Sequence, residues 1–267
     1  LIFGIGPFPE MGVVGAAVAT SIGRGLAVLY QFYLLFRGKH RIKISRDDMV
    51  IRFKIIRQII KVSIGGIGQN LIATSSWIGL MRIVSTFGSE AVAGYTIGIR
   101  IIIFSLLPSW GISNAAATLV GQNLGAKQPE RAERSVWVTG KINAVFLGSL
   151  GVIFIMFPTF FIELFIKDPG VVESGVACLR IISYGFMMYG FGMVMVQSFN
   201  GAGDTATPTK INLISFWMIE IPLAWFLAKV AGMEQDGVYV AIVVAETVMT
   251  ILAIWLFRKG KWKEKQV

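Results

Sequence analysis

Cysteine and histidine, two residue types that often bind metals or take part in catalysis, are scarce in this sequence. It has one cysteine, Cys178, and one histidine, His40. A single cysteine can form neither a disulfide within the chain nor a zinc site of several cysteines. A single histidine in a basic loop gives little support for a catalytic triad or a His-ligated metal. We therefore expect no catalytic residues, no bound metal, no organic cofactor and no enzymatic activity, which leaves a membrane-embedded enzyme a weak alternative.

Charged residues are also few. They make up 15% of the chain, against 55% hydrophobic residues, whereas an ordinary soluble domain has about 25% charged residues. This balance leaves too little polar surface to cover a globule in water. Apolar segments of about 20 residues, the length of a transmembrane helix, recur from end to end. The sequence predicts an all-α, polytopic membrane protein with about seven transmembrane helices.

The predicted spans are separated by short turn signals. We predict spans at residues 12–36, 62–87, 91–120, 136–157, 171–199, 211–230 and 237–257. Glycine, proline and small polar residues at 87–90, 167–170 and 201–204 indicate turns or links between them. Residues 121–125 lack the spacing of a phosphate-binding loop and fit better as a tight turn. An ion gradient is therefore the expected energy source.

The positive charges are distributed unevenly between the connections. Of 25 Lys and Arg residues, 19 lie in 37–61, 121–141, 200–210 and 258–267, which share one side if seven spans alternate. The positive-inside rule then predicts a cytoplasmic C-terminus, and we place the protein in a bacterial inner (plasma) membrane. Because the basic residues separate apolar spans and form no exposed basic face, we expect no nucleic-acid partner despite the net charge of +10.

A repeat links the two ends of the chain. Residues 11–19 followed by 36–39 resemble 236–245 followed by 257–261, as equivalent helices of two parallel transporter halves would. On this interpretation 1–36 is the last helix of a truncated N-terminal lobe, and 62–267 is a six-helix C-terminal lobe. Residues 37–61 are a basic cytoplasmic linker, in which 51–60 forms either an interfacial amphipathic helix or a solvated one. The missing N-terminal half would be a partner.

Three stretches carry a family resemblance. They are 91–100 (AVAGYTIGIR), 119–126 (LVGQNLGA) with 130–134 (ERAER), and 197–208 (QSFNGAGDTATP). In them the chain resembles the multidrug and toxic compound extrusion (MATE) family of antiporters. The resemblance implies twelve helices in two lobes, a central cavity, and export of cationic or amphipathic small molecules in exchange for H⁺ or Na⁺. Some members carry an acidic coupling residue on the helix that corresponds to 62–87, where this chain has none.

Two carboxylates lie well inside predicted spans. Glu220 and Glu246 are about nine or ten residues from the outer ends of adjacent antiparallel spans, or about 14 Å deep. Ionisable groups at this depth are costly and suggest function, so we predict that at least one binds the coupling proton or a cationic substrate. The structural alternative is a set of Glu–Arg pairs that only hold helices together, formed with buried arginines at Arg24, Arg100 and Arg180.

Uncharged polar and aromatic residues are the other candidates for a coupling-ion or substrate site. Gln69 and Asn70 in the second span and Asn114 in the third could line a cavity, although polar side chains also join helices in membranes. In the fifth span, Tyr184 and Tyr189 are the preferred contacts for an organic cation, because aromatic faces attract cations.

Two prolines fall inside predicted spans. Pro108 lies in the third span, and Pro222 lies two residues after Glu220. Each is expected to kink or interrupt its helix. A bend beside Glu220 could couple protonation to helix movement, although ordinary kinked packing explains it equally.

Together these features favour a secondary active efflux antiporter that exports organic cations or drugs in exchange for H⁺ or Na⁺. A flippase for lipid-linked oligosaccharides or lipids is the closest alternative, and a more cationic cavity would distinguish it, since phosphates must be held. A seven-helix receptor is a more distant alternative. The repeat between the first and last spans and the nine basic residues at 37–61 argue against it.

Overall fold

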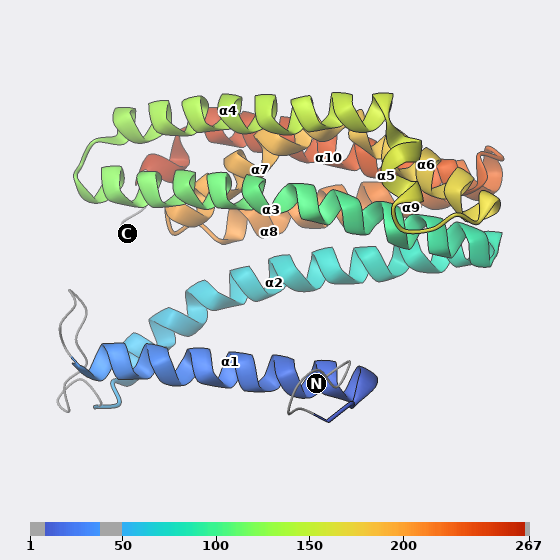
Figure 1. The fold of residues 1–267 in the computed structure, drawn as a ribbon. Helices are drawn as coiled ribbons and strands as arrows, with labels where there is room; N and C mark the ends of the chain where they lie inside the picture. The colour runs from blue at the N-terminus through green and yellow to red at the C-terminus, as the bar shows by residue number, and fades with distance from the viewer. Residues whose placement is uncertain (1–8, 38–49, 265–267) are drawn as a thin grey trace. The chain divides into compact units, whose positions relative to one another are not determined.

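Regular structure in this chain is helical. A computed structural model describes residues 9–37 and 50–264, and every regular element in these two ranges is a helix (Figure 1). The prediction of an all-α membrane protein is confirmed. His40 and most of the predicted basic linker lie outside the described ranges.

Two units make up the chain, one ending at Arg57 and the other beginning at Gln58. In the first unit, α1 (Gly12–Arg37) buries Gly15 and leaves its other residues exposed or partly exposed. The helix α2 (Phe53–Val84) runs through the unit boundary. The predicted amphipathic segment is therefore not a separate helix, because its residues from Phe53 onward are the first turns of α2. The division at residues 36 and 61 stays a prediction.

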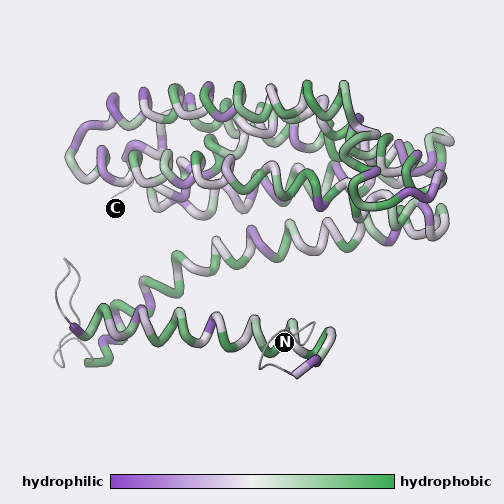
Figure 2. Tube along the Cα trace, in the orientation of Figure 1, coloured by the Kyte–Doolittle hydropathy of each residue, from purple (hydrophilic) through white to green (hydrophobic). Residues whose placement is uncertain are grey.

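The second unit is a bundle of long helices joined by short elements (Figure 1). Helices α3, α4, α6, α7 and α10 pack against one another in it. Apolar residues dominate the middles of its helices, and hydrophilic residues gather toward the ends (Figure 2). After α2 its elements are η2 (Ser85–Phe87), α3 (Ser89–Gly125), α4 (Pro129–Met156), α5 (Pro158–Glu163), α6 (Pro169–Ser183), α7 (Phe186–Gly201), α8 (Ala206–Asn212), η3 (Leu213–Glu220), α9 (Ile221–Trp225), η4 (Phe226–Val230), α10 (Glu234–Arg258) and η5 (Lys261–Glu264).

The turns form largely where the sequence predicts them. Gly88, between η2 and α3, has φ of +103°, a left-handed conformation that favours glycine. Asp168 caps α6 by accepting a hydrogen bond of 3.1 Å from the backbone N–H of Val171. The predicted turn at 121–125 is wrong, because these residues are the last turn of α3 and the chain turns just after Gly125. Small residues alone do not stop a helix whose apolar face is packed.

The number of membrane spans depends on α2. In the described residues five helices are long and apolar enough to cross a membrane: α1, α3, α4, the run Ala206–Val230 and α10. Helices α6 and α7 make a sixth together, bent by 57°. The predicted span at 171–199 is therefore broken, at Tyr184 and Gly185. The predicted span at 62–87 lies in α2, which is 32 residues long. Because it contains many polar residues, α2 is not among the helices that are apolar enough to cross a membrane.

Small residues bring α3 and α6 close together. A Cβ added at Gly94 would lie 2.6 Å from the backbone nitrogen of Gly175, and one at Gly98 would lie 2.9 Å from Sγ of Cys178. Helices in membranes commonly approach through such small residues. This contact lies in the core that includes Tyr95, whose ring stacks on that of Tyr239 at 6.0 Å.

The helix that carries Glu220 is irregular. Its residues Leu213–Glu220 and Phe226–Val230 are π-helical, and Pro222 lies between these two segments. Proline has no N–H to donate, so the preceding turn loses an α-helical hydrogen bond, and the N–H of Ile221 instead bonds the carbonyl of Phe216. Pro222 thus coincides with the predicted distortion beside Glu220. Pro108, by contrast, lies inside α3 without interrupting it.

Candidate functional site

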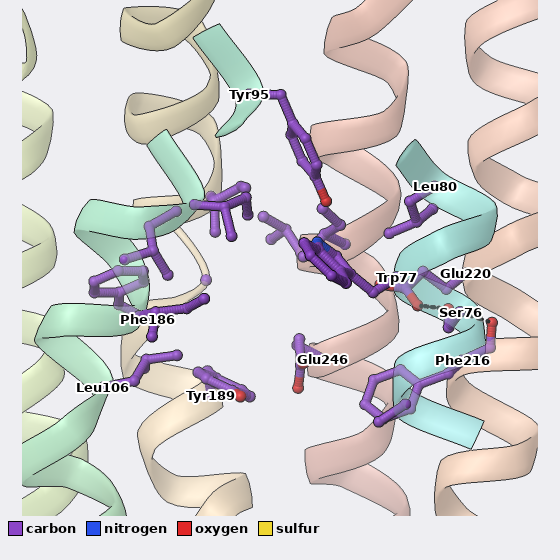
Figure 3. Close-up of a pocket in the computed structure, with 18 of the residues that line it drawn as sticks. Ser76, Trp77, Leu80, Tyr95, Leu106, Phe186, Tyr189, Phe216, Glu220 and Glu246 are labelled. Atoms are coloured by element: carbon purple, nitrogen blue, oxygen red, sulfur yellow. Dashed lines mark hydrogen bonds between the residues drawn. The ribbon is translucent and has the colours of Figure 1, made fainter. Parts of the chain in front are cut away.

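The two predicted carboxylates line one cavity in the second unit. This carboxylate cavity has a volume of about 370 Å³ and is lined by residues of α2, α3, α6, α7, η3 and α10. Its wall is mostly apolar and aromatic, and Glu220 and Glu246 enter it from neighbouring helices (Figure 3). The antiparallel pairing of the last two spans therefore brings the carboxylates to one site, as the sequence predicts.

Glu220 accepts a hydrogen bond from a serine of another helix. The carboxylate is 5% exposed, at the end of the π-helical segment η3. Ser76 of α2 donates a hydrogen bond of 2.5 Å to its Oε2 atom, the dashed line in Figure 3. This contact joins residues 144 positions apart. The sequence places Ser76 on a polar helix but gives no sign of its partner.

Glu246 has less support. It lies on α10 and is partly buried, and its Oε2 atom is buried with no hydrogen-bond partner in the described part of the chain. Two carboxylates that share an apolar space repel each other and lose hydration. The cavity therefore favours any species that supplies positive charge, such as a proton, a metal cation or an organic cation.

The predicted buried arginines are not part of this site. Arg24, Arg100 and Arg180 are all exposed. In the described part of the chain no ion pair joins Glu220 or Glu246 to an arginine. The prediction of burial is wrong because position along a span gives depth in the membrane, whereas the side of the helix decides what the side chain contacts. Structural Glu–Arg pairs are thereby not observed.

A second cavity lies beside the first and is lined by amides. This amide cavity has a volume of about 720 Å³. The predicted residues Gln69, Asn70 and Asn114 all line it, so the structure brings this group together. Asn70, however, donates to the backbone carbonyl of Gly66 in its own helix.

A chain of side-chain hydrogen bonds runs along the amide cavity. Gln69 Nε2 donates to Asn200 Oδ1 at 3.1 Å, Asn200 Nδ2 donates to Gln197 Oε1 at 2.6 Å, and Gln197 Nε2 donates to Asn114 Oδ1 at 2.7 Å. The chain connects α2, α7 and α3. Sequence reasoning missed Gln197, Asn200 and Asn212 as lining residues because all three lie near predicted span ends, where polar residues are expected.

The two cavities share a wall that is mostly aromatic. The residues that line both cavities are Trp110, Tyr189 and Phe216, together with Ala73. The structure thus places Tyr189 where a cation contact is predicted. Tyr184 is not in either cavity and is 64% exposed, because it lies at the bend between α6 and α7, which rotates it away.

The sequence profile of the MatE family matches residues 67–226, which include α3 to η3 and most of both cavities. The chain belongs to the MatE family. The predicted family resemblance is confirmed.

Curated relatives of this MatE-family chain are transporters, which indicates a protein other than an enzyme. A probable multidrug resistance protein NorM from Thermotoga maritima is 28% identical over 270 residues, covering 100% of this chain and 57% of the relative. A FAD transporter from Shewanella oneidensis is 26% identical over 262 residues, covering 97% and 57%. The chain thus spans a little over half the length of these relatives.

Solved structures show the same fold. An outward-facing multidrug resistance MATE family transporter aligns with a TM-score of 0.88 and 21% identity, covering 97% of this chain and 58% of that one. A MOP superfamily transporter from Pyrococcus furiosus aligns with a TM-score of 0.89 and 20% identity, covering 98% and 60%. This MatE-family chain therefore has the fold of these solved structures and is an all-α, polytopic membrane protein.

Proposed function

We propose that this MatE-family chain is part of a secondary active exporter that moves organic cations or amphipathic drugs out of the cell in exchange for H⁺ or Na⁺. The observation that carries the proposal is the pairing of Glu220 and Glu246 in one apolar cavity, with an unpartnered oxygen on Glu246. Both residues are the coupling-ion or substrate ligands in this proposal.

The chemistry of the cavity supports cation binding. Desolvating two carboxylates costs several kcal/mol per charge unless an opposite charge compensates them. A cationic drug would gain this compensation together with contact to Trp77, Trp110 and Tyr189, whose ring faces attract cations. The mostly apolar wall would accept the rest of an amphipathic molecule.

Competition for the same carboxylates would couple the two fluxes. An organic cation and a coupling ion each neutralise Glu220 and Glu246. Binding of one therefore weakens binding of the other, because the negative charge that attracts both is already neutralised. A transporter that must hold one or the other while its cavity changes sides exchanges them across the membrane. Protons and sodium ions both suit this role, since each binds carboxylate oxygen.

The charge distribution supports an orientation in which the C-terminus lies on the cytoplasmic side of a bacterial inner membrane. Basic residues lie at the end of α10 and just after it, at Arg258, Lys259, Lys261 and Lys263, and others lie in and after the α3–α4 turn at Lys127, Arg131 and Arg134. Because the chain covers 57% of its relatives, we also infer that a preceding half of the same protein completes the transporter with a second lobe.

A lipid flippase is less well supported. A cavity for phosphate groups would need arginine or lysine side chains. The carboxylate cavity instead holds two glutamates, and its described lining contains neither Lys nor Arg.

Transport of ethidium into inverted membrane vesicles, which corresponds to export from the cell, tests the proposal. The vesicles contain the protein together with its preceding half. Transport is driven by a proton gradient and, separately, by a sodium gradient. We expect one gradient to drive export and Glu246→Gln to lower the rate at least about tenfold, since one lost charge contact is worth about 1.5–3 kcal/mol. Glu163→Gln is the matched control, because Glu163 is an exposed glutamate outside both cavities.

The two variants separate the outcomes. Equal rates in Glu246→Gln and the native protein would remove Glu246 from the mechanism. Export of no cation under either gradient would contradict the antiporter proposal and return the flippase to first place.

A further inference from the structure

The amide cavity is not used by the charge competition described above. It is larger than the carboxylate cavity, about 720 Å³ against about 370 Å³, and falls within the size range of small-molecule sites, roughly 300–1,000 Å³. None of its described lining residues is charged. Whatever it binds is therefore recognised by hydrogen bonds and by shape.

Asn212 shows that the hydrogen bonding of this cavity is incomplete. It lies at the junction of α8 and η3, lines the amide cavity and is 8% exposed. Its Oδ1 atom is buried and has no hydrogen-bond partner among the residues that the structure describes. Buried polar atoms in proteins are almost always paired, and an unpaired one calls for an explanation. A ligand that donates a hydrogen bond in this cavity would supply the missing partner.

The rest of the lining has both kinds of hydrogen-bonding group. The chain Gln69–Asn200–Gln197–Asn114 consists of four amides, each able to donate and to accept. A ligand group that both donates and accepts, such as a carboxamide or a ring imide, can exchange hydrogen bonds with such a chain. A charged group would find no counter-ion among these residues.

The two cavities adjoin through a shared aromatic wall. Trp110, Tyr189 and Phe216 line both, so a planar molecule stacked on these rings would reach both spaces. Its cationic part would face Glu220 and Glu246, and its uncharged polar part would face Asn212.

We propose that the amide cavity is a second substrate subsite, which selects cations that also carry an uncharged carboxamide-like group. Asn212 is its specificity-determining residue. This inference rests on the proposed function, because it assigns the cationic part of the same molecule to the carboxylate cavity.

Two pyridinium ions that differ only in a carboxamide test the inference. The probes are 1-benzyl-3-carbamoylpyridinium and 1-benzylpyridinium, and isothermal titration calorimetry of the purified protein with its preceding half gives both dissociation constants. We expect the carbamoyl compound to bind more tightly. Asn212→Leu is expected to reduce that preference roughly three- to tenfold, the value of one neutral hydrogen bond.

Asn123→Leu is the matched control. Asn123 is also 8% exposed, but it donates to the Leu119 carbonyl of its own helix and lines neither cavity. Asn212→Ala is the second test variant, in case the leucine fills the cavity. The effects of substitution at Asn212 and Asn123 on ligand preference can therefore be compared at equal burial. The melting temperature of each variant shows whether it is folded.

Each result decides between the two proposals. Equal affinity of the native protein for both probes, an unchanged preference in both Asn212 variants, or the same loss in Asn123→Leu would overturn the subsite. Those outcomes leave the cation site intact if Glu246→Gln weakens binding of both pyridinium ions. If Glu246→Gln changes neither affinity, the proposed function fails instead, and the subsite fails with it.

Discussion

Ser76 on α2 and Glu220 at the end of η3 form a hydrogen bond of 2.5 Å across the second unit. It holds the Glu220 carboxylate in a cavity whose wall is mostly apolar (Figure 3). The two residues are 144 positions apart in the sequence and lie on different helices. The bond therefore ties α2 to the distorted helix around Pro222, so that movement of either helix changes the environment of the carboxylate.

The first prediction concerns this hydrogen bond. Ser76→Ala is expected to slow cation export about tenfold, because it leaves a carboxylate oxygen unpaired in an apolar space at a cost of about 1.5–3 kcal/mol. Initial rates of ethidium export in inverted vesicles measure the effect.

Ser105→Ala is the control for Ser76→Ala. The Ser105 hydroxyl donates only to the Ile101 carbonyl of its own helix, at 3.1 Å, and the residue lines neither cavity. Equal rates in the two variants would show that Glu220 does not depend on Ser76.

A second prediction concerns the close contact of α3 and α6. Gly94→Ala is expected to lower the free energy of unfolding by about 1–3 kcal/mol, the usual cost of overpacking, because the added Cβ would lie 2.6 Å from the backbone of Gly175. Backbone atoms cannot move aside as a side-chain tip can. Thermal unfolding in detergent, followed by circular dichroism, measures the change.

Gly111→Ala on the same helix is expected to have the opposite effect. Nothing lies within 4 Å of a Cβ built there, so alanine should stabilise α3 by about 0.5–1 kcal/mol through its higher helix propensity. A melting temperature of Gly94→Ala at or above that of Gly111→Ala would contradict the packing argument.

A third prediction concerns the end of the chain. Trp262 is 1% exposed, stacks on Phe257 at 4.6 Å and donates to the Phe257 carbonyl at 3.0 Å. Trp262→Ala is expected to destabilise the second unit by about 3 kcal/mol, as truncation of a buried aromatic residue does. Lys263→Gln is expected to cost about 0.5 kcal/mol, because the ion pairs it removes are partly exposed. Denaturant unfolding compares the two variants.

The ion pairs of Lys263 give that prediction a pH dependence. Lys263 Nζ lies 2.6 Å from Glu133 Oε2 and 3.1 Å from Glu130 Oε1, and the hydrogen bond to Glu133 raises the pKa of Lys263 above its ordinary value. A raised lysine pKa gives stability that is fully present below the ordinary value, about 10.4, and is lost as pH rises through the folded-state value. The small difference between Lys263→Gln and the native protein should therefore stay constant from about pH 7 to pH 9 and disappear as pH rises through the raised pKa of Lys263 in the folded state.

Lys210→Gln serves as the control for Lys263→Gln, since Lys210 is also an exposed basic residue near the end of a helix. It should change the unfolding free energy at no pH in this range. A pH-dependent difference as large in Lys210→Gln as in Lys263→Gln would assign the effect to net charge and not to the ion pairs.

The sequence by itself determined the helices, most of their limits and the residues worth testing. Apolar runs of membrane-spanning length can only be helices or barrel strands in lipid, and turn residues such as Gly88 and Asp168 mark where the helices end. Depth along a span follows from counting residues, which is why Glu220 and Glu246 were predicted at matching depth. Their shared cavity agrees with that count.

The tertiary structure decided which side of each helix a residue faces and what it meets there. Arg100 and Arg180 lie at depths similar to those of the glutamates, but their side chains are exposed, since a rotation of about 100° per residue separates neighbouring positions on a helix. The bend between α6 and α7 turned Tyr184 away and left Tyr189 in the wall between the cavities. Asn212 resembles an ordinary span-end residue until the packing of α8 against α7 and α10 buries it at the amide cavity. These contacts join residues far apart in the chain, and no local pattern of residue types contains that information.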